Sequence, residues 1–150
     1  MGRISEKLAS HSIIGLDTSV FIYQLEAHPA YSPITQELLA GVQASQWQAV
    51  TSTITVMELT VPAWQTDRES TAREYETLLA NFPNLALEDV TRHVARLAAQ
   101  LRARYKIRPV DAVQVASSLI YKATAFVTND RGLSRLGEMI DVIILDECLN

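Results

Sequence analysis

The stretch most informative about the architecture reads Ile13-Ile14-Gly15-Leu16-Asp17-Thr18-Ser19. Its first four residues form a short apolar run of the kind found in buried strands, and the run stops at an aspartate. Asp-Thr-Ser is favourable N-cap chemistry, so the pattern predicts a strand over residues 12–16 that leads directly into a helix over residues 19–26. A buried strand followed at once by a helix is typical of a parallel sheet covered by helices.

The same alternation of short apolar runs and helical periodicities continues through the rest of the chain. Further strands are predicted at residues 48–51, 85–87, 125–128 and 142–145. Helices are predicted to begin at Pro33, after Ser52-Thr53, after Asp67, at Glu88-Asp89 and at Pro109, with Pro62 ending or kinking the second of these. The pattern therefore predicts one α/β domain over residues 1–150, with about five parallel strands and right-handed crossovers.

Composition limits the compartment and the partners. Hydrophobic residues make up 48% of the 150 residues and charged residues 20%, as in ordinary globular proteins. No stretch approaches the roughly 20 apolar residues that a membrane span needs, and a single cysteine cannot form an internal disulfide. The cytoplasm is therefore the expected compartment. A formal charge of −4 gives no general attraction to nucleic acid, so a nucleic-acid enzyme of this charge needs a local basic strip or a bound cation.

Four acidic residues stand where an active site of this fold is expected. Asp17 and Asp130 follow predicted strands, Asp111 lies in a first helical turn, and Glu58 lies in a helix after the second strand. Ligands of open parallel sheets bind beyond the carboxyl ends of the strands. Alone, each acid has a simpler role as a helix cap, a partner of a helix dipole, a turn residue or a solvated side chain. Together in one cleft they would repel one another unless a cation such as Mg²⁺ or Mn²⁺ neutralised them.

Four blocks of sequence hold these acids in a defined order. They read Gly15-Leu16-Asp17-Thr18-Ser19-Val20-Phe21-Ile22-Tyr23, Ser52-Thr53-Ile54-Thr55-Val56-Met57-Glu58-Leu59, Val110-Asp111-Ala112-Val113-Gln114-Val115-Ala116-Ser117-Ser118 and Phe126-Val127-Thr128-Asn129-Asp130. In order and spacing these blocks are similar to the PIN-domain nucleases, and more narrowly to the VapC-type toxins of toxin–antitoxin pairs. The resemblance extends over about residues 13–145.

The resemblance implies a three-layer PIN-like fold with a five-stranded parallel sheet, and a Mg²⁺- or Mn²⁺-dependent endoribonuclease that hydrolyses RNA phosphodiester bonds. Carried over by position, Asp17, Glu58, Asp111 and Asp130 would be the catalytic metal ligands or would hold ligating water. Thr128 would offer its hydroxyl to a water or phosphate, or would simply bond the turn that follows its strand. An antitoxin protein and a second copy of the chain are the partners that the resemblance implies.

Positive charge is concentrated in residues 92–108, which contain Arg92, Arg96, Arg102, Arg104, Lys106 and Arg108. Such a strip could guide an RNA backbone toward the acids, because phosphate contacts supply most non-specific affinity. The alternative is a solvated helix face opposite the apolar positions of the same helix. Arg108 lies nearest the acids in sequence and is the predicted phosphate contact.

Three other functions are compatible with an acid after the first strand. A haloacid-dehalogenase phosphatase needs a second acid two positions after Asp17, where this chain has Ser19. A signalling receiver domain needs a paired acid near Asp17 and a lysine after a late strand, and Asn129-Asp130-Arg131 does not supply that lysine. A catalytically inactive PIN-like module that binds RNA or protein remains open, because residue identity alone does not separate it from a nuclease.

Overall fold

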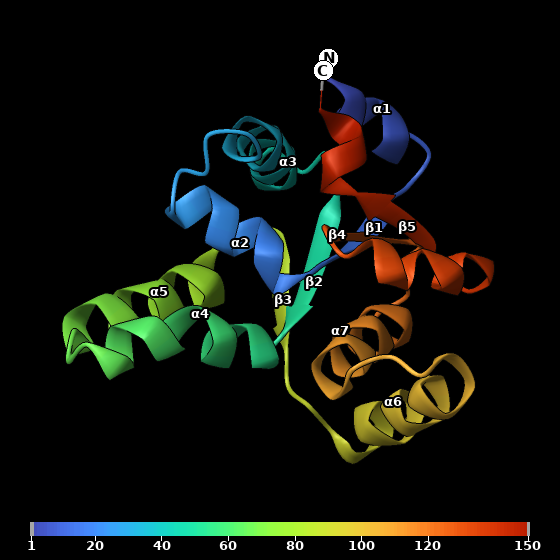
Figure 1. Cartoon of the computed structure of the whole chain (residues 1–150). Helices are drawn as coiled ribbons and strands as arrows, with labels where there is room; N and C mark the ends of the chain where they lie inside the picture. The colour runs from blue at the N-terminus through green and yellow to red at the C-terminus, as the bar shows by residue number, and fades with distance from the viewer. Residues whose placement is uncertain (1, 150) are drawn as a thin grey trace.

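A five-stranded sheet, parallel throughout, forms the centre of the computed structural model, which describes residues 2–149 (Figure 1). The strand order is β3-β2-β1-β4-β5. The first strand is thus central, with Ile14 paired to Ala49 on one side and to Ala125 on the other. The strands are β1 (Ile13–Leu16), β2 (Gln48–Ser52), β3 (Leu85–Glu88), β4 (Ala125–Thr128) and β5 (Asp141–Ile144). The predicted five-stranded parallel sheet is confirmed.

The chain leaves β1 in opposite directions along the sheet, toward β2 and β3 and toward β4 and β5. Strand order therefore reverses between β1 and β4, and the crevice beyond their carboxyl ends is where open α/β sheets bind ligands. Asp17 and Asp130 follow the two strands that border this crevice.

Side chains alternate from face to face along each strand, so both faces of the sheet carry apolar side chains. Helices cover both faces. Ala125 and Val127 pack into one apolar core and Phe126 into the other. The first core receives α1 (Arg3–Leu8), α2 (Thr18–Leu25), α3 (Ser32–Gln43), α4 (Ile54–Gln65), α5 (Glu69–Asn81) and the short 3-10 helix η2 (Leu145–Cys148). The second receives α6 (Arg92–Tyr105), α7 (Pro109–Ile120) and the 3-10 helix η1 (Arg131–Glu138).

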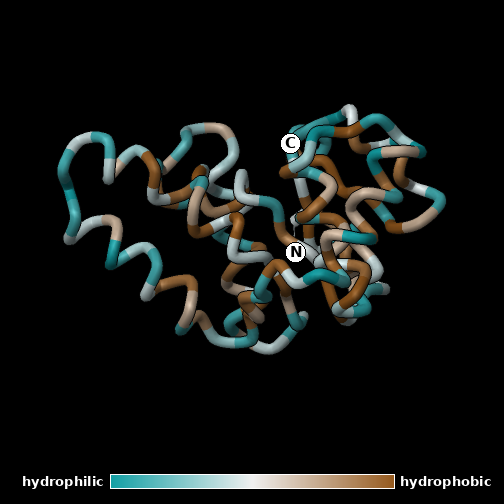
Figure 2. The backbone as a smooth tube through the Cα atoms, turned by 90° about the horizontal axis from the view of Figure 1, so that it is seen from below, coloured by the Kyte–Doolittle hydropathy of each residue, from teal (hydrophilic) through white to brown (hydrophobic). Residues whose placement is uncertain are grey.

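Figure 2 shows hydrophobic residues gathered where these elements meet, while the turn at the outer end of the α4–α5 pair is hydrophilic. Helix α1 and η2 lie side by side at one end of the molecule (Figure 1). Neither was predicted, nor was η1. Cys148 is a buried free thiol of the first core. Within residues 2–149, each helix is too short or too polar to span a membrane.

Several helix boundaries differ from the predicted ones. Helix α4 does not end at Pro62 but continues to Gln65, because Ala63 beyond the proline is buried and α5 packs along the helix. Helix α6 begins at Arg92, since Glu88 belongs to β3 and Thr91 supplies the cap by accepting a hydrogen bond from the Val94 N–H at 3.1 Å. The prediction of Glu88-Asp89 as its start was wrong. The predicted cap of α5, Asp67, instead has a positive φ of 55° at the end of the preceding turn.

Gly15 allows α7 to approach β1 closely. A Cβ atom at this position would lie 2.6 Å from the Ser118 Cβ and 3.0 Å from a ring carbon of Phe126, so any side chain would displace its neighbours. The small residues predicted to let this helix sit near the sheet, Ala112 and Ser118 among them, are indeed buried. This close packing places the first turn of α7 at the carboxyl edge of the sheet, beside Asp17.

Candidate functional site

Asp17 ends β1 and caps α2, so one residue connects the central strand to the first helix. Its Oδ1 accepts a hydrogen bond from the Thr18 N–H at 2.8 Å, and its Oδ2 accepts one from the Thr128 hydroxyl at 2.7 Å. Burial raises the pKa of the Asp17 carboxyl to about 6, the two hydrogen bonds lower it, and the charges of Asp111 and Glu58 raise it further. The charges of Asp111 and Glu58 therefore lie close enough to act on Asp17.

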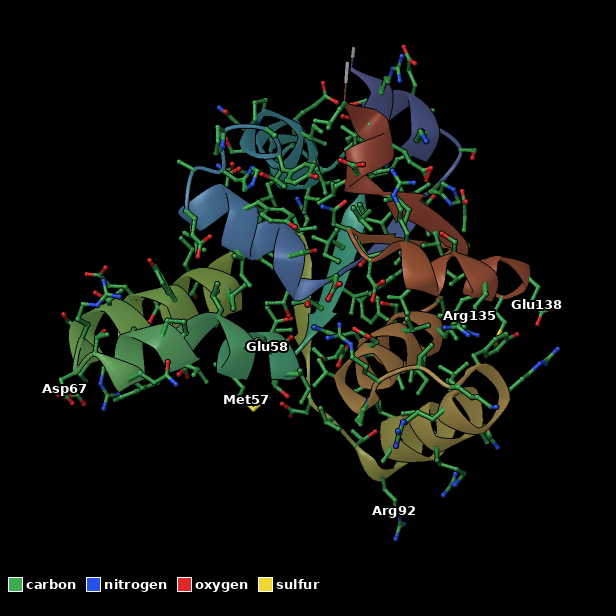
Figure 3. The ribbon with its side chains drawn as sticks, in the orientation of Figure 1. Met57, Glu58, Asp67, Arg92, Arg135 and Glu138 are labelled. Carbon is green, nitrogen blue, oxygen red and sulfur yellow. The ribbon has the colours of Figure 1, made fainter. Side chains whose placement is uncertain are left out.

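Glu58 lies on α4 beside the start of α2 (Figure 3). Its Oε1 accepts a hydrogen bond from the Thr18 hydroxyl at 2.7 Å. Within the described residues no protein group hydrogen-bonds to its Oε2. Thr18 therefore contacts two acids of the site, Asp17 through its amide and Glu58 through its hydroxyl.

Asp111 lies in the first turn of α7 and is only 4% exposed. Such burial of a carboxylate needs a partner, and Arg108 supplies it. The Arg108 Nε donates to Asp111 Oδ2 at 2.8 Å and its Nη2 to Oδ1 at 3.3 Å. The same Nη2 lies 3.8 Å from Asp130 Oδ2. Asp111, Asp130 and, more weakly, Asp17 raise the pKa of the Arg108 guanidinium. Arg108 therefore lies among the acids as a cation.

Asp130 caps η1: its Oδ1 accepts a hydrogen bond from the Gly132 N–H at 2.9 Å, and its Oδ2 faces Arg108. Thr128 is fully buried, donates its hydroxyl proton to Asp17 and accepts a hydrogen bond from the Asp130 N–H at 3.2 Å. The Thr128 hydroxyl thus bonds the turn that follows its strand, and its role toward a water or phosphate stays a prediction. Asn129 holds the same turn from the other side, accepting from the Asp146 N–H at 2.9 Å and donating to the Tyr23 hydroxyl at 3.1 Å.

The donor set fits a hard divalent cation. The carboxylates offer only oxygen ligands, which Mg²⁺ and Mn²⁺ prefer. The Ser19 hydroxyl, in the first turn of α2, is a buried polar atom without a partner in the described part of the chain, as expected where a water or ligand completes the shell. Among residues 2–149 no three acidic side chains are close enough to form a ready-made metal cage. An ion would therefore retain several waters, as Mg²⁺ usually does.

The sequence did not predict that the buried side chain of Gln114 holds Glu58 through Thr18. Gln114, on the face of α7 that also carries Asp111, donates hydrogen bonds to Thr18 and Thr55. The one signal available was a glutamine among the apolar and small residues of this helix. Of the predicted basic strip, only Arg108 reaches the acids. Arg104 instead pairs with Glu138 at 3.0 Å, and the Arg102 Nε donates to the Ile107 carbonyl oxygen at 3.0 Å.

Comparison with known proteins identifies the same fold. The family model described as the PIN domain matches residues 14–139. Among curated proteins no sequence matches this chain. Among solved structures, a toxin–antitoxin complex from Klebsiella pneumoniae aligns with a TM-score of 0.64 at 18% identity, covering 89% of this chain and 97% of the other.

Two further solved structures are similar to the same extent. VapBC2 from Rickettsia felis, bound to a DNA fragment from its promoter, aligns with a TM-score of 0.66 at 18% identity over 88% of this chain and 98% of the other. FitAcB from Neisseria gonorrhoeae aligns with a TM-score of 0.65 at 20% identity over 89% and 97%. At such identities these likenesses establish the fold.

Proposed function

The chain belongs to the PIN-domain family, and from this premise we propose that it is a metal-dependent endoribonuclease, the toxin of a toxin–antitoxin pair. The observation that carries the proposal is the arrangement of Asp17, Glu58, Asp111 and Asp130 around the carboxyl ends of β1 and β4, with the Arg108 guanidinium between two of them. Acids gathered at the ligand-binding edge of a parallel sheet can hold a divalent cation, and such a cation suits phosphodiester hydrolysis.

Four carboxylates would hold the ion, directly or through water: Asp17, Glu58, Asp111 and Asp130. A bound Mg²⁺ or Mn²⁺ supplies activation of the attacking water and neutralises charge that develops on the phosphate. The chain's own groups keep the acids in place. Thr128 and the Thr18 amide hold Asp17, while the Thr18 hydroxyl holds Glu58.

Arg108 is the proposed phosphate contact. Its side chain is 76% exposed although it pairs with Asp111. Its Nη1 has no protein partner within residues 2–149, so this nitrogen is available to a phosphate oxygen. Arginine suits this task because its planar fork of donors matches phosphate geometry. Arg92 and Arg96 form no ion pair with any residue that the structure describes, and they could extend the path of the RNA backbone along α6.

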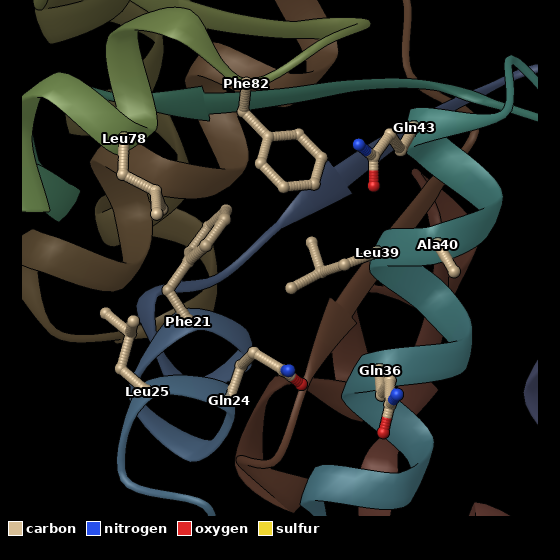
Figure 4. A pocket seen from close by; sticks show the side chains of 9 residues that line it. All are labelled: Phe21, Gln24, Leu25, Gln36, Leu39, Ala40, Gln43, Leu78 and Phe82. Atoms are coloured by element: carbon tan, nitrogen blue, oxygen red, sulfur yellow. The ribbon is translucent and has the colours of Figure 1, made fainter.

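An antitoxin peptide is the proposed protein partner. The solved relatives from Klebsiella pneumoniae and Rickettsia felis are toxin–antitoxin complexes by their descriptions. This chain offers an apolar groove of about 390 Å³ between α2, α3 and α5, into which Phe21, Leu39 and Phe82 project (Figure 4). A second hollow of about 260 Å³ lies between α2, α4 and α5 and is lined by Glu58. A peptide that spans both would reach the site.

The proposal also includes a homodimer. Three side chains form an exposed apolar stripe along α4, at Met57 (49% exposed), Val61 (39%) and Trp64 (50%). Their spacing places them on one face of the helix. An exposed row of large apolar residues is unusual for a surface that only water contacts.

The test is cleavage of a mixed set of structured and single-stranded RNAs in Mg²⁺, Mn²⁺ or EDTA. Cutting should require the metal and should vanish in Asp17→Asn. The matched control is Asp67→Asn, the same substitution at the far end of the α4–α5 pair (Figure 3), which should cut like the wild type. In cells, expression of the wild type alone should arrest growth and expression of Asp17→Asn should not.

Two outcomes would contradict the proposal. Cutting that survives both EDTA and Asp17→Asn would exclude these carboxylates as the site. Binding of RNA without cleavage, under every metal condition, would favour a PIN-like module that binds without catalysis.

A further inference from the structure

A cluster of buried polar side chains lies directly behind the candidate site. Its members come from four elements: Thr18 of α2, Thr51 and Ser52 of β2, Thr55 of α4 and Gln114 of α7. None is more than 4% exposed. Buried polar groups are costly unless they are all paired, so the direction of each hydrogen bond in such a network is determined by its neighbours.

The orientation of the Gln114 amide follows from Ser52. The Ser52 N–H and hydroxyl lie 3.3 and 2.9 Å from one end of the amide. A backbone N–H can only donate, so this end is the carbonyl oxygen, Oε1. The other end is therefore the NH₂ group, and its two protons are donated to the hydroxyl oxygens of Thr18 at 3.0 Å and Thr55 at 2.7 Å.

Two chains of hydrogen bonds start from this NH₂ group. In one, Thr55 donates to Thr51 at 2.7 Å, because the Thr51 proton is already donated to the Leu16 carbonyl at 2.9 Å and a carbonyl can only accept. In the other, Thr18 receives a hydrogen bond from Gln114 and donates its own proton to Glu58 Oε1 at 2.7 Å. The second chain ends on an acid of the candidate site.

We propose that Gln114 is a positioning residue of the carboxylate site, acting through Thr18 on Glu58. By donating to Thr18, Gln114 commits the Thr18 proton to Glu58 Oε1, and the other oxygen, Oε2, is left to face a ligand. Gln114 also lies three residues after Asp111 on α7, so the same side chain ties the helix of Asp111 to α2 and α4. It therefore sets the distance between Glu58 and Asp111. This role in catalysis rests on the proposed nuclease function.

The test compares the two chains of hydrogen bonds. Gln114→Met removes the donor of both. Thr18→Val removes the Thr18 hydroxyl, and with it the hydrogen bond from Gln114, the 3.2 Å contact with Thr55 and the hydrogen bond to Glu58. The matched control, Thr51→Val, breaks only the chain that ends on Leu16. Mn²⁺ affinity is measured by electron paramagnetic resonance of the free ion, well below each variant's unfolding temperature. We expect Gln114→Met and Thr18→Val each to weaken Mn²⁺ binding by about tenfold, as loss of a partner that orients a metal ligand commonly does. Thr51→Val should destabilise the fold and leave Mn²⁺ affinity unchanged.

A second measurement needs no metal. The ¹³C chemical shift of the Glu58 side-chain carboxyl, recorded at pH 7 in EDTA, reports the hydrogen bond that Glu58 accepts. Thr18→Val, which removes the hydrogen bond to Glu58, should move this resonance most. Gln114→Met, which keeps the Thr18 hydroxyl but removes the group that orients it, should move the resonance in the same direction, and Thr51→Val should leave it in place. The double variant Thr18→Val/Gln114→Met should match Thr18→Val alone, because both changes interrupt one chain. Gln114→Asn, which keeps an amide but has a shorter reach, should shift the resonance as well, and it replaces Gln114→Met if that variant does not fold.

The outcomes separate this inference from the function on which it rests. A Glu58 resonance that is unmoved in the Gln114 variants, or moved as much by Thr51→Val, would overturn the positioning role. A wild type that binds no Mn²⁺ would overturn the metal-dependent function, and the chemical shift would still decide the role of Gln114.

Discussion

Asp17 combines a buried carboxyl with two hydrogen bonds and two acidic neighbours. Burial is the largest influence, and it raises the pKa from its ordinary value of 3.8 to about 6. Because the pKa of Asp17 is higher in the folded state than in the unfolded state, protonated Asp17 stabilises the fold. This stabilisation is fully present below about pH 4 and is lost as the pH rises through about 6. In the absence of metal, ionised Asp17 thus destabilises the fold at neutral pH.

Asp17→Asn should therefore stabilise the metal-free protein at pH 7.5. We expect its free energy of unfolding in EDTA to exceed that of the wild type by about 1–3 kcal/mol, with the difference shrinking toward pH 4. Asparagine also caps helices, so α2 retains its cap. Urea denaturation at a series of pH values measures this. If the free energies of unfolding of the two proteins differed by the same amount at every pH, Asp17 would not be the group responsible for this pH dependence.

Arg108 pairs with Asp111 and lies near Asp130, so it and a divalent ion compete for the same charges. Arg108→Ala should bind Mn²⁺ more tightly and RNA more weakly. The slope of log affinity for RNA against log salt should fall in magnitude by roughly one unit on this substitution. Arg92→Ala, at an exposed position of α6, is the control for Mn²⁺ binding and should not change it. Weaker Mn²⁺ binding by Arg108→Ala would contradict the competition.

At the scale of elements, the contact between β1 and α7 sets the position of the site. Asp17 leaves the end of β1, whereas Asp111 and Gln114 lie on α7, and the absence of a side chain at Gly15 lets the two elements touch. Any displacement of α7 would move Asp111 away from Asp17 and stretch the Gln114 hydrogen bonds. The site therefore depends on a residue that has no chemistry of its own.

Gly15→Ala should lower both stability and metal binding. Its Cβ would meet the Ser118 Cβ at 2.6 Å, and such overpacking commonly costs about 1–3 kcal/mol. Gly137→Ala is the matched control, because a Cβ there meets no atom within 4 Å. Thermal unfolding and Mn²⁺ titration of both variants measure the effects. If Gly15→Ala unfolded and bound Mn²⁺ like the wild type, close packing of α7 would not be what sets the site.

On the scale of the whole molecule, the acids of the candidate site and the apolar stripe of α4 lie on different parts of the surface. The site lies at the carboxyl edge of the sheet, whereas Met57, Val61 and Trp64 follow one side of α4. Helices α4 and α5 project together from the sheet (Figure 1), so this side is accessible to a second copy. A dimer formed there would place α4, which carries Glu58, near its partner.

Val61→Asp should convert the predicted homodimer to a monomer, because a carboxylate in an apolar interface is costly to desolvate. Sedimentation velocity over a range of concentrations measures the change. Met139→Asp alters an equally exposed apolar residue, on the far side of the sheet at the end of η1, and should leave the dimer intact. A wild type that sediments as a monomer throughout would contradict the homodimer.

Local patterns were enough to predict the architecture. The apolar run before Asp17 and the runs before Glu88 and Asp130 mark strands, because burial between two helical layers requires continuous apolar sequence. The parallel sheet, and the placement of Asp17 and Asp130 after its strands, followed from these patterns. The helix boundaries near Pro62 and Glu88 did not, because packing by α5 and the cap at Thr91 outweighed local propensity.

Local sequence patterns set the order of strands and helices along the chain and the side chains available at each strand end. Folding alone brings the Arg108 guanidinium within 3.8 Å of Asp130 and joins Gln114 to Thr18, 96 residues away, to hold Glu58. Periodicity and capping act over a few residues, so a local pattern can predict them. Contacts between elements depend instead on the crossover connections and on which side chains are still unpaired when the helices pack on the sheet. In the sequence, Gln114 is only a glutamine among the apolar and small residues of a helix. In the folded protein it is buried among three hydroxyl groups.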